Sequence, residues 1–232
     1  MSTLRPPPRI GLVREPLGML EIPRLFLNGP SLALQPRGNG EPVLVLPGYG
    51  ASDASTFVLR SYLGLLGYDA RGWGLGRNTG DVRGFVPRMI EIARELSAQK
   101  RTGVRLIGWS LGGVLARETA RERPDLVARV VTLGSPVVGG PKYTLVGETY
   151  RRQGFDLDAI EAAVAERNRV PIRVPVTAIY SRYDGVVAWR ACVDESCERT
   201  EHVEVRTTHL GLGFAADVYR IIAQRLARGD DE

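Results

Sequence analysis

The sequence predicts a doubly wound α/β fold, in which helices cover both faces of a mostly parallel sheet. The main observation is that short β-branched runs alternate with amphipathic helical stretches along most of the 232 residues. A composition of 44% hydrophobic and 25% charged residues is enough for one sizeable core, and it excludes collagen-like, low-complexity and disordered classes. We therefore expect one domain over residues 1–232.

Six short segments are expected to be strands, most of them apolar and β-branched, and the last one alternates Val203 and Val205 with polar residues. The six runs are Pro42–Leu46, Tyr68–Gly72, Val104–Gly108, Arg129–Leu133, Pro175–Tyr180 and His202–Arg206. The expected helices have apolar residues at helical spacing, and they are Ala54–Leu66, a helix from near Gly84 to Gln99, Leu111–Glu122 and Phe214–Ala227. Ser52 or Asp53 is expected to cap the first of them.

Two segments fall outside this alternation. Residues 1–41 form an N-terminal extension, and about 37 residues, 137–173, separate the fourth run from the fifth. The second segment contains the helix-like stretch Asp156–Arg169 and is too long for a plain connection. We expect it to be a short helical lid inserted over an edge of the sheet.

The N-terminal extension shows no targeting or membrane-spanning pattern. Charged and proline residues interrupt Met1–Arg14, so the stretch lacks the unbroken apolar run of a secretory signal, and no window has the roughly 18 apolar residues of a membrane span. The apolar stretch Leu17–Leu34 is expected to pack against the domain, with peripheral contact with a lipid surface left open. We expect a cytoplasmic protein in which Cys192 and Cys197 are reduced thiols rather than a small disulfide.

Charge does not indicate a nucleic-acid partner. The net charge is +5, and 29 of the 31 cationic residues are arginine, yet these are scattered and form no basic arm. The chain has only two histidines, His202 and His209, which leaves little room for a histidine-rich metal site. No metal or cofactor is expected.

One motif carries chemistry. Gly108-Trp109-Ser110-Leu111-Gly112 matches G-x-S-x-G between an expected strand and an expected helix. In such a sharp turn the serine hydroxyl is pushed out of the sheet, and the glycines avoid collisions with the neighbouring strand and helix. Ser110 is therefore the candidate nucleophile.

A serine nucleophile needs a base, and the base needs an orienting carboxylate. His209 follows the last expected strand and precedes a glycine-containing loop, whereas His202 falls on the polar face of that strand. Asp184 follows the fifth strand, so all three candidates lie at the carboxyl ends of parallel strands, which meet at one edge of the sheet. Rival acids are Asp53, Asp194, Glu195 and Glu198.

Backbone N–H groups are expected to stabilise the negative charge that develops on the substrate oxygen. Leu111 supplies one such group by its place after Ser110. The second should come from the loop after the first strand, with Tyr49 preferred and Gly50 as the alternative. Five residues are expected to contact substrate, and the aromatic ones among them would suit an apolar acyl chain: Tyr49, Trp73, Trp109, Trp189 and Leu210.

From about Pro42 to the C-terminus the chain resembles the α/β-hydrolase superfamily, and within it the bacterial lipases and esterases. The resemblance rests on four motifs: Leu46-Pro47-Gly48-Tyr49-Gly50, Gly108-Trp109-Ser110-Leu111-Gly112-Gly113, Asp184-Gly185-Val186-Val187 and His209-Leu210-Gly211. Many relatives have histidine-glycine where this chain has Pro47-Gly48. Arg77-Asn78 has no chemical role that the sequence indicates, and an anchor for a loop is the simplest interpretation.

The expected function is that of a serine carboxylic-ester hydrolase, an esterase or lipase that acts through an acyl-enzyme on a small-molecule ester. The triad of Ser110, Asp184 and His209 serves equally a thioesterase, lactonase, amidase or acyltransferase, because these reactions share the acyl-enzyme. A hydrolase-like binding module without activity is a more remote alternative. No nucleic-acid partner and no transmembrane segment are expected.

Overall fold

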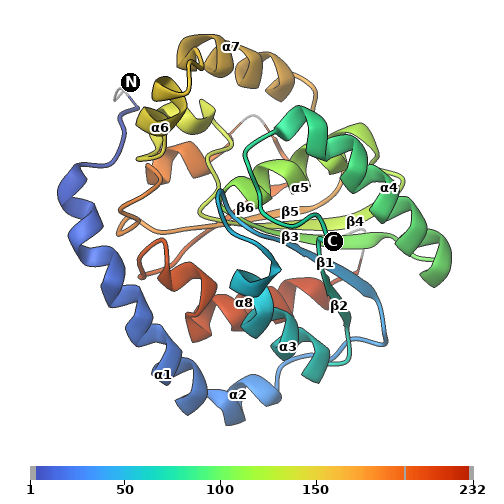
Figure 1. Ribbon diagram of the computed structural model, residues 1–232. Helices are drawn as coiled ribbons and strands as arrows, with labels where there is room; N and C mark the ends of the chain where they lie inside the picture. Colours follow the sequence, from blue (N-terminus) through green and yellow to red (C-terminus); the bar gives the residue numbers. More distant parts are fainter. Residues whose placement is uncertain (1–3, 196, 230–232) are drawn as a thin grey trace.

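A six-stranded, wholly parallel sheet forms the centre of the protein (Figure 1). The computed structural model describes residues 4–195 and 197–229. The strands are β1 (Pro42–Leu46), β2 (Asp69–Gly72), β3 (Val104–Trp109), β4 (Val127–Leu133), β5 (Val176–Tyr180) and β6 (Thr200–Glu204). Their order is β2-β1-β3-β4-β5-β6, so the chain first runs outward from β1 to β2 and then crosses back to β3. This reversal is the switch point at which α/β sheets place their sites.

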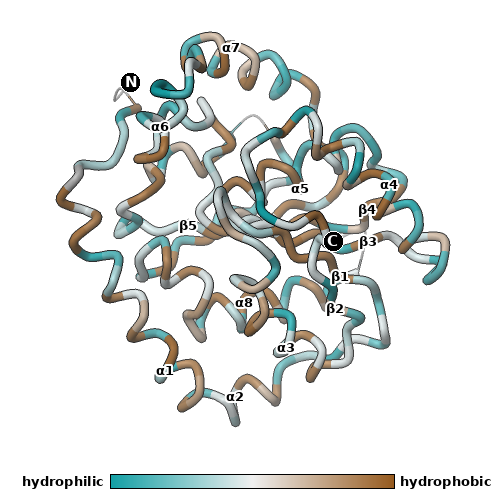
Figure 2. The backbone as a smooth tube through the Cα atoms, viewed as in Figure 1, coloured by the Kyte–Doolittle hydropathy of each residue, from teal (hydrophilic) through white to brown (hydrophobic). Residues whose placement is uncertain are grey.

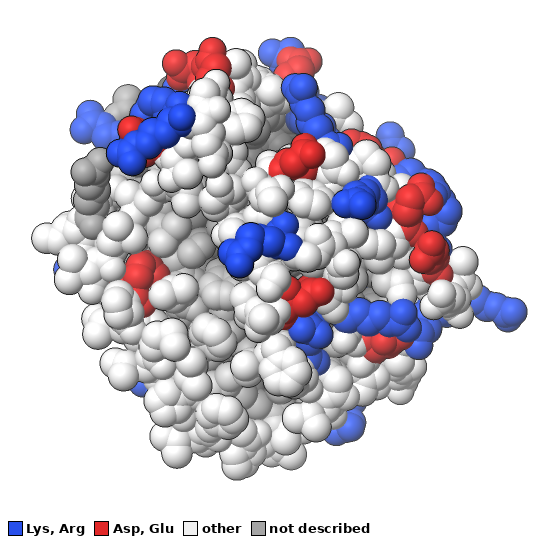
Figure 3. Space-filling view, in the orientation of Figure 1, with Lys and Arg blue, Asp and Glu red and all other residues white. Residues whose placement is uncertain are grey.

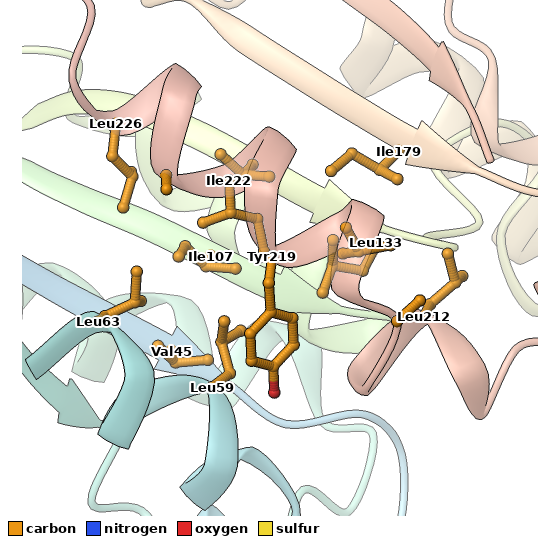
Figure 4. Packing of buried hydrophobic residues seen from close by; sticks show 14 of the residues in the cluster. Val45, Leu59, Leu63, Ile107, Leu133, Ile179, Leu212, Tyr219, Ile222 and Leu226 are labelled. Atoms are coloured by element: carbon orange, nitrogen blue, oxygen red, sulfur yellow. The ribbon is translucent and has the colours of Figure 1, made fainter. Parts of the chain in front are cut away.

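Helices cover both faces of the sheet, and the predicted fold class is confirmed. α3 (Phe57–Leu65) and α8 (Ala216–Leu226) lie on one face, and α4 (Val82–Lys100) and α5 (Leu111–Glu122) on the other (Figure 1). Alternate residues of β1 belong to the two cores: Val43 and Val45 pack in one, and Leu44 and Leu46 in the other. Figure 4 shows the core beneath α3 and α8, formed by residues that include Val45, Leu59, Leu63, Ile107, Leu133, Ile179, Tyr219, Ile222 and Leu226.

Several element ends differ from the prediction. The helix expected over Ala54–Leu66 is divided into a 3₁₀ turn, η2 (Asp53–Thr56), and α3, and the Ser52 side chain makes no capping bond. The Asp53 carboxylate instead accepts the N–H groups of Trp73 and Gly74, at 2.9 and 3.1 Å, and so holds the loop after β2. β4 and β6 each begin two residues before the predicted start.

A helical insertion follows β4. It contains η3 (Gly140–Tyr143), α6 (Gly147–Arg152) and α7 (Leu157–Asn168), and α6 and α7 lie at the top of Figure 1. The Asp156 carboxylate accepts the N–H groups of Asp158 and Ala159 and caps α7. Arg167, near the end of α7, pairs with Glu118 and Glu122 of α5, so the insertion is tied to the helix that follows Ser110.

The N-terminal segment, residues 9–34, runs along one side of the molecule and contains η1 (Arg9–Leu20), α1 (Glu21–Leu27) and α2 (Gly29–Ala33). Leu25 and Leu32 are buried in the core beneath α8, which agrees with the expected packing. Many of its apolar residues are nevertheless exposed, and Figure 2 shows apolar stretches along the segment. The exposed large apolar residues are Ile10, Leu12, Val13, Leu17, Met19, Leu20, Phe26, Leu27 and Leu34. None of the described helices is both long and apolar enough to cross a membrane.

Candidate active site

Ser110 occupies a strained turn between β3 and α5. Its backbone has φ 55° and ψ −121°, a conformation that side-chain-bearing residues rarely adopt, and its N–H donates to the carbonyl of Leu133 at 2.7 Å. A Cβ atom at Gly108 would lie 2.2 Å from the Gly113 nitrogen, and one at Gly112 would lie 2.3 Å from the Leu46 oxygen. The glycines of the motif are therefore required where β1, β3 and α5 meet.

Asp184 and His209 form a buried pair. His209 Nδ1 and Asp184 Oδ2 are 2.7 Å apart, and each residue is only 7% exposed. The other carboxylate oxygen, Oδ1, accepts the N–H groups of Val186 at 2.8 Å and Val187 at 2.7 Å. These bonds hold the carboxylate so that its second oxygen faces the imidazole.

The electrostatic surroundings of His209 favour its protonated form. Burial of the ring lowers the pKa of His209, but the charge and hydrogen bond of Asp184, with a further contribution from Glu15, raise that pKa above the ordinary value of 6.5. Because Asp184 engages Nδ1, the Nε2 nitrogen is the one left to exchange a proton with another group.

Ser110 and the Asp184–His209 pair lie at the same edge of the sheet. The indole N–H of Trp109, the residue before Ser110, donates to the His209 carbonyl at 3.2 Å, and the two rings are 6.2 Å apart. Gly134, directly after β4, is so close that a Cβ atom there would lie 2.9 Å from Asp184 Oδ2. Among the described residues no hydrogen bond joins the Ser110 hydroxyl to His209. The structure therefore shows Asp184 paired with His209, with Ser110 at the same edge of the sheet.

The loop after β1 faces the serine. A Cβ atom at Gly48 would lie 3.3 Å from Ser110 Cβ. Asn78 is fully buried. Its side-chain NH₂ group donates to Pro47 O at 2.9 Å, and its backbone carbonyl accepts the N–H of Gly50 at 2.7 Å. Within the described residues neither Tyr49 N–H nor Leu111 N–H has an acceptor, whereas Gly50 N–H is already used. Of the two predicted donors in this loop, Gly50 therefore donates its N–H to Asn78.

The anchoring of this loop answers what the sequence left open for Arg77-Asn78. Arg77 donates to Gly50 O at 2.6 Å, and Asn78 makes the bonds described above. Both residues therefore position the loop after β1, as the interpretation of a loop anchor required.

The aromatic residues expected to contact substrate do not form one group. Trp73 is a correction: it is 1% exposed, packs on Phe85 with ring centroids 4.8 Å apart, and donates its indole N–H to Gly76 O, so it belongs to the core. Trp109 is also largely buried, and its indole N–H donates to the backbone carbonyl of His209. Trp189 stacks on Tyr180 at 5.8 Å, with the guanidinium groups of Arg182 and Arg190 over its ring.

Tyr49 and Leu210 remain at the surface of the site. The Tyr49 ring lies 5.4 Å from that of Tyr150 in α6, and Tyr150 lies 5.4 Å from Phe155, so the helical insertion brings an aromatic row to the loop after β1. Leu210, next to His209, is 37% exposed.

The rival residues Asp53, Asp194 and His202 have partners outside the Asp184–His209 pair. Asp194 forms a buried ion pair with Arg117, and its N–H donates to His202 Nε2 at 3.1 Å. Burial lowers the pKa of His202 and favours the neutral ring that this bond needs. Asp53 binds the loop after β2, and Glu195 and Glu198 are exposed. Cys192 and Cys197 are free and buried.

The sequence reasoning missed Glu15. This residue of η1 is 4% exposed, and its carboxylate accepts backbone N–H groups from the loops that carry Asp184 and His209. The only signal in the sequence was an acidic residue in a largely apolar stretch, which does not identify partners about 170 residues further along the chain. No group of three or more potential metal ligands is found within the described residues.

A parallel sheet with a serine at a strained strand-to-helix turn is the architecture of an α/β hydrolase. Comparison with known proteins agrees: the model of the alpha/beta hydrolase family matches residues 43–230. The chain belongs to the alpha/beta hydrolase family.

Three relatives illustrate the range of that family. A pimeloyl-[acyl-carrier protein] methyl ester esterase of Sodalis glossinidius (strain morsitans) is 29% identical over 161 residues, which are 67% of this chain and 56% of that protein, little more than half its length. A structure of the metagenome-derived lipolytic enzymes LipS and LipT has a TM-score of 0.62 at 16% identity and covers 83% of this chain and 94% of its own. A thioesterase domain from the curacin biosynthetic pathway has a TM-score of 0.58 at 15% identity, covering 84% and 93%.

The electrostatics of the buried pair can be measured directly, because the chain has only two histidines. In an NMR titration we expect the His209 ring to titrate with a midpoint above 6.5, since Asp184 stabilises the imidazolium. In Asp184→Asn the midpoint should fall below 6.5, because burial then opposes the charge. His202→Gln assigns the signals, and a midpoint unchanged by Asp184→Asn would contradict the coupling.

Proposed function

We propose that the protein is a serine hydrolase of carboxylic esters. The observation that supports this most directly is the strained Ser110 turn, at the edge of the sheet where the Asp184–His209 pair lies. A serine hydroxyl needs an adjacent base, and His209 has its Nε2 nitrogen left for that role. Asp184 would orient the ring and stabilise its cation.

The proposed reaction has two halves. Ser110 Oγ attacks the carbonyl carbon while its proton passes to His209 Nε2, and the carbonyl oxygen becomes an oxyanion. The tetrahedral intermediate collapses as the ester C–O bond breaks, and the departing alkoxide takes the proton from His209. Water then attacks the acyl-enzyme, gives a proton to His209, and releases the acid as that proton returns to Ser110.

The oxyanion would be held by two backbone N–H groups, those of Leu111 and Tyr49. Both are without acceptors among the described residues, and both adjoin Ser110: Leu111 in sequence and the Tyr49 loop through the close approach of Gly48. Donors held in place before the reaction stabilise the developing charge without reorganisation. Asn78 and Arg77 would serve by keeping the Tyr49 loop in position.

We propose an apolar acyl chain as the substrate group. The row of Tyr49, Tyr150 and Phe155 runs from the loop after β1 into the helical insertion, and such rings bury a large apolar area. Residues 137–173 would then act as a lid whose inner side contacts the acyl chain, with Leu210 on the histidine side. A thioesterase would use the same residues, so the leaving group must be determined by experiment.

The N-terminal segment supports peripheral contact with an anionic lipid surface. Its outer side carries nine exposed large apolar residues, and the side chains described as exposed and charged over residues 4–37 are those of Arg5, Arg14, Arg24 and Arg37. Its two acidic residues, Glu15 and Glu21, face inward. In Figure 3 the surface over α1 and α2 is mostly uncharged. Apolar residues with flanking arginines are typical of helices that lie in the interface of an anionic membrane.

Replacement of the nucleophile is the first test. In Ser110→Ala, turnover of a p-nitrophenyl ester should fall on the order of 10⁴-fold or more, because the acyl-enzyme cannot form. Covalent labelling by a fluorophosphonate should be lost as well. Ser61→Ala, an exposed serine on α3, is the control and should behave as wild type. Turnover that survives in a folded Ser110→Ala protein would refute the proposal.

The substrate class is tested by a chain-length series. Among p-nitrophenyl esters, kcat/KM should rise from acetate to chains of about eight carbons, and Tyr150→Ala should reduce the rate on the long chains about tenfold. Phe57→Ala, an exposed aromatic on α3, serves as the control. Activity confined to acetate and butyrate is the contrary result. Matched thioesters in the same series show whether the enzyme prefers a thiol leaving group.

Lipid contact is tested by sedimentation with vesicles. The wild type should bind phosphatidylglycerol vesicles more tightly than phosphatidylcholine vesicles, and salt should weaken the binding. Phe26→Ser/Leu27→Ser/Leu34→Ser should lose about tenfold or more in affinity, whereas Phe57→Ser/Leu65→Ser on α3 should not. Equal binding by both variants, or a concentration-dependent dimer in place of vesicle binding, would overturn this proposal.

A further inference from the structure

Glu15 connects the N-terminal segment to both candidate loops at once. Its Oε1 atom accepts the N–H of Gly185, the residue after Asp184, at 2.8 Å and the N–H of His209 at 3.1 Å. Its Oε2 atom accepts the N–H of Leu210 at 2.8 Å. One buried carboxylate thus holds three backbone groups from two loops that lie 170 to 195 residues further along the chain.

The backbone around Glu15 is packed tightly against the same loops. A Cβ atom at Gly11 would lie 2.9 Å from Gly185 Cα, and one at Gly18 would lie 2.3 Å from the Thr208 hydroxyl and 2.6 Å from the nitrogen of Gly211. The Thr208 hydroxyl also donates to the Glu15 carbonyl, at 3.4 Å. The segment therefore contacts the acid loop at Gly11 and the histidine loop at Gly18, with Glu15 between the two contacts.

We propose that Glu15 is a positioning residue for the acid and the base, a role that rests on the proposed serine-hydrolase function. It touches neither the reacting atoms nor the serine. Its carboxylate fixes the backbone of His209 itself and of the residue after Asp184, and so fixes the distance across which His209 and Asp184 interact.

Two physical effects follow from this arrangement. The first is geometric, because a displacement of about 1 Å in a reacting group can cost on the order of 10²-fold in rate. The second is electrostatic, since Glu15 and Asp184 are the two carboxylates that raise the pKa of His209 against its burial. The two effects can be separated by changing the reach and the charge of the side chain independently.

Glu15→Gln keeps the length of the side chain but removes its charge. It also replaces one acceptor oxygen with an NH₂ group, which cannot accept a hydrogen bond from a backbone N–H. We expect kcat to fall about tenfold with little change in KM, and the His209 midpoint in an NMR titration to fall. Glu15→Asp keeps the charge but shortens the reach. It should lower kcat while leaving the His209 midpoint close to that of wild type.

Glu21→Gln is the matched control, because Glu21 lies on the same segment but contacts the Thr207 hydroxyl and Arg24 rather than a loop N–H. It should have the kcat and the midpoint of wild type. Rates are expressed per site labelled by a fluorophosphonate, so that loss of folded protein is not read as loss of catalysis.

The inference is overturned if Glu15→Gln and Glu15→Asp lower only the thermal midpoint and keep the wild-type kcat per labelled site and the wild-type His209 titration. The NMR titration needs no substrate. A wild type that hydrolyses no ester or thioester therefore counts against the proposed function, while a shifted His209 midpoint in Glu15→Gln still supports the contact between Glu15 and the histidine.

Discussion

The close approach of β1, β3 and α5 is the constraint on which the rest of the structure depends. Side chains at Gly108 and Gly112 would collide with backbone atoms at 2.2 and 2.3 Å, so the chain can turn from strand to helix at Ser110 only with glycines there. The positive φ of Ser110 is the local consequence. A strained conformation of this kind persists only where the surrounding structure determines it, and here the buried sheet and α5 do so.

The same edge imposes a second requirement, a buried carboxylate beside a buried imidazole. Such a pair is stable only if its polar atoms have partners. Asp184 satisfies its free oxygen with the N–H groups of Val186 and Val187, so the carboxylate needs no water. Its charge then outweighs the burial of His209 and raises the pKa of the imidazole. The charge of a carboxylate on one loop thus raises the pKa of a histidine on another.

Local patterns predicted the fold well because a buried parallel strand is recognisable from its own residues. β1 has the predicted ends, and α5 follows the serine as expected. The placing of Trp73 was wrong because an aromatic beside a glycine loop can face the core or the site, and only the packing on Phe85 decides. Glu15 could not be predicted, since its three partners are contributed by loops about 170 and 195 residues away.

The N-terminal segment has two sides with different physical characters. On the inner side Glu15 and two glycines contact the loops of Asp184 and His209, and on the outer side apolar residues face solvent beside arginines. Exposed apolar area of this extent favours contact with another surface. Both sides occur within η1, where Glu15 faces the loops and Leu17, Met19 and Leu20 face solvent. Glu15 is thus a residue through which the N-terminal segment contacts the loops of Asp184 and His209.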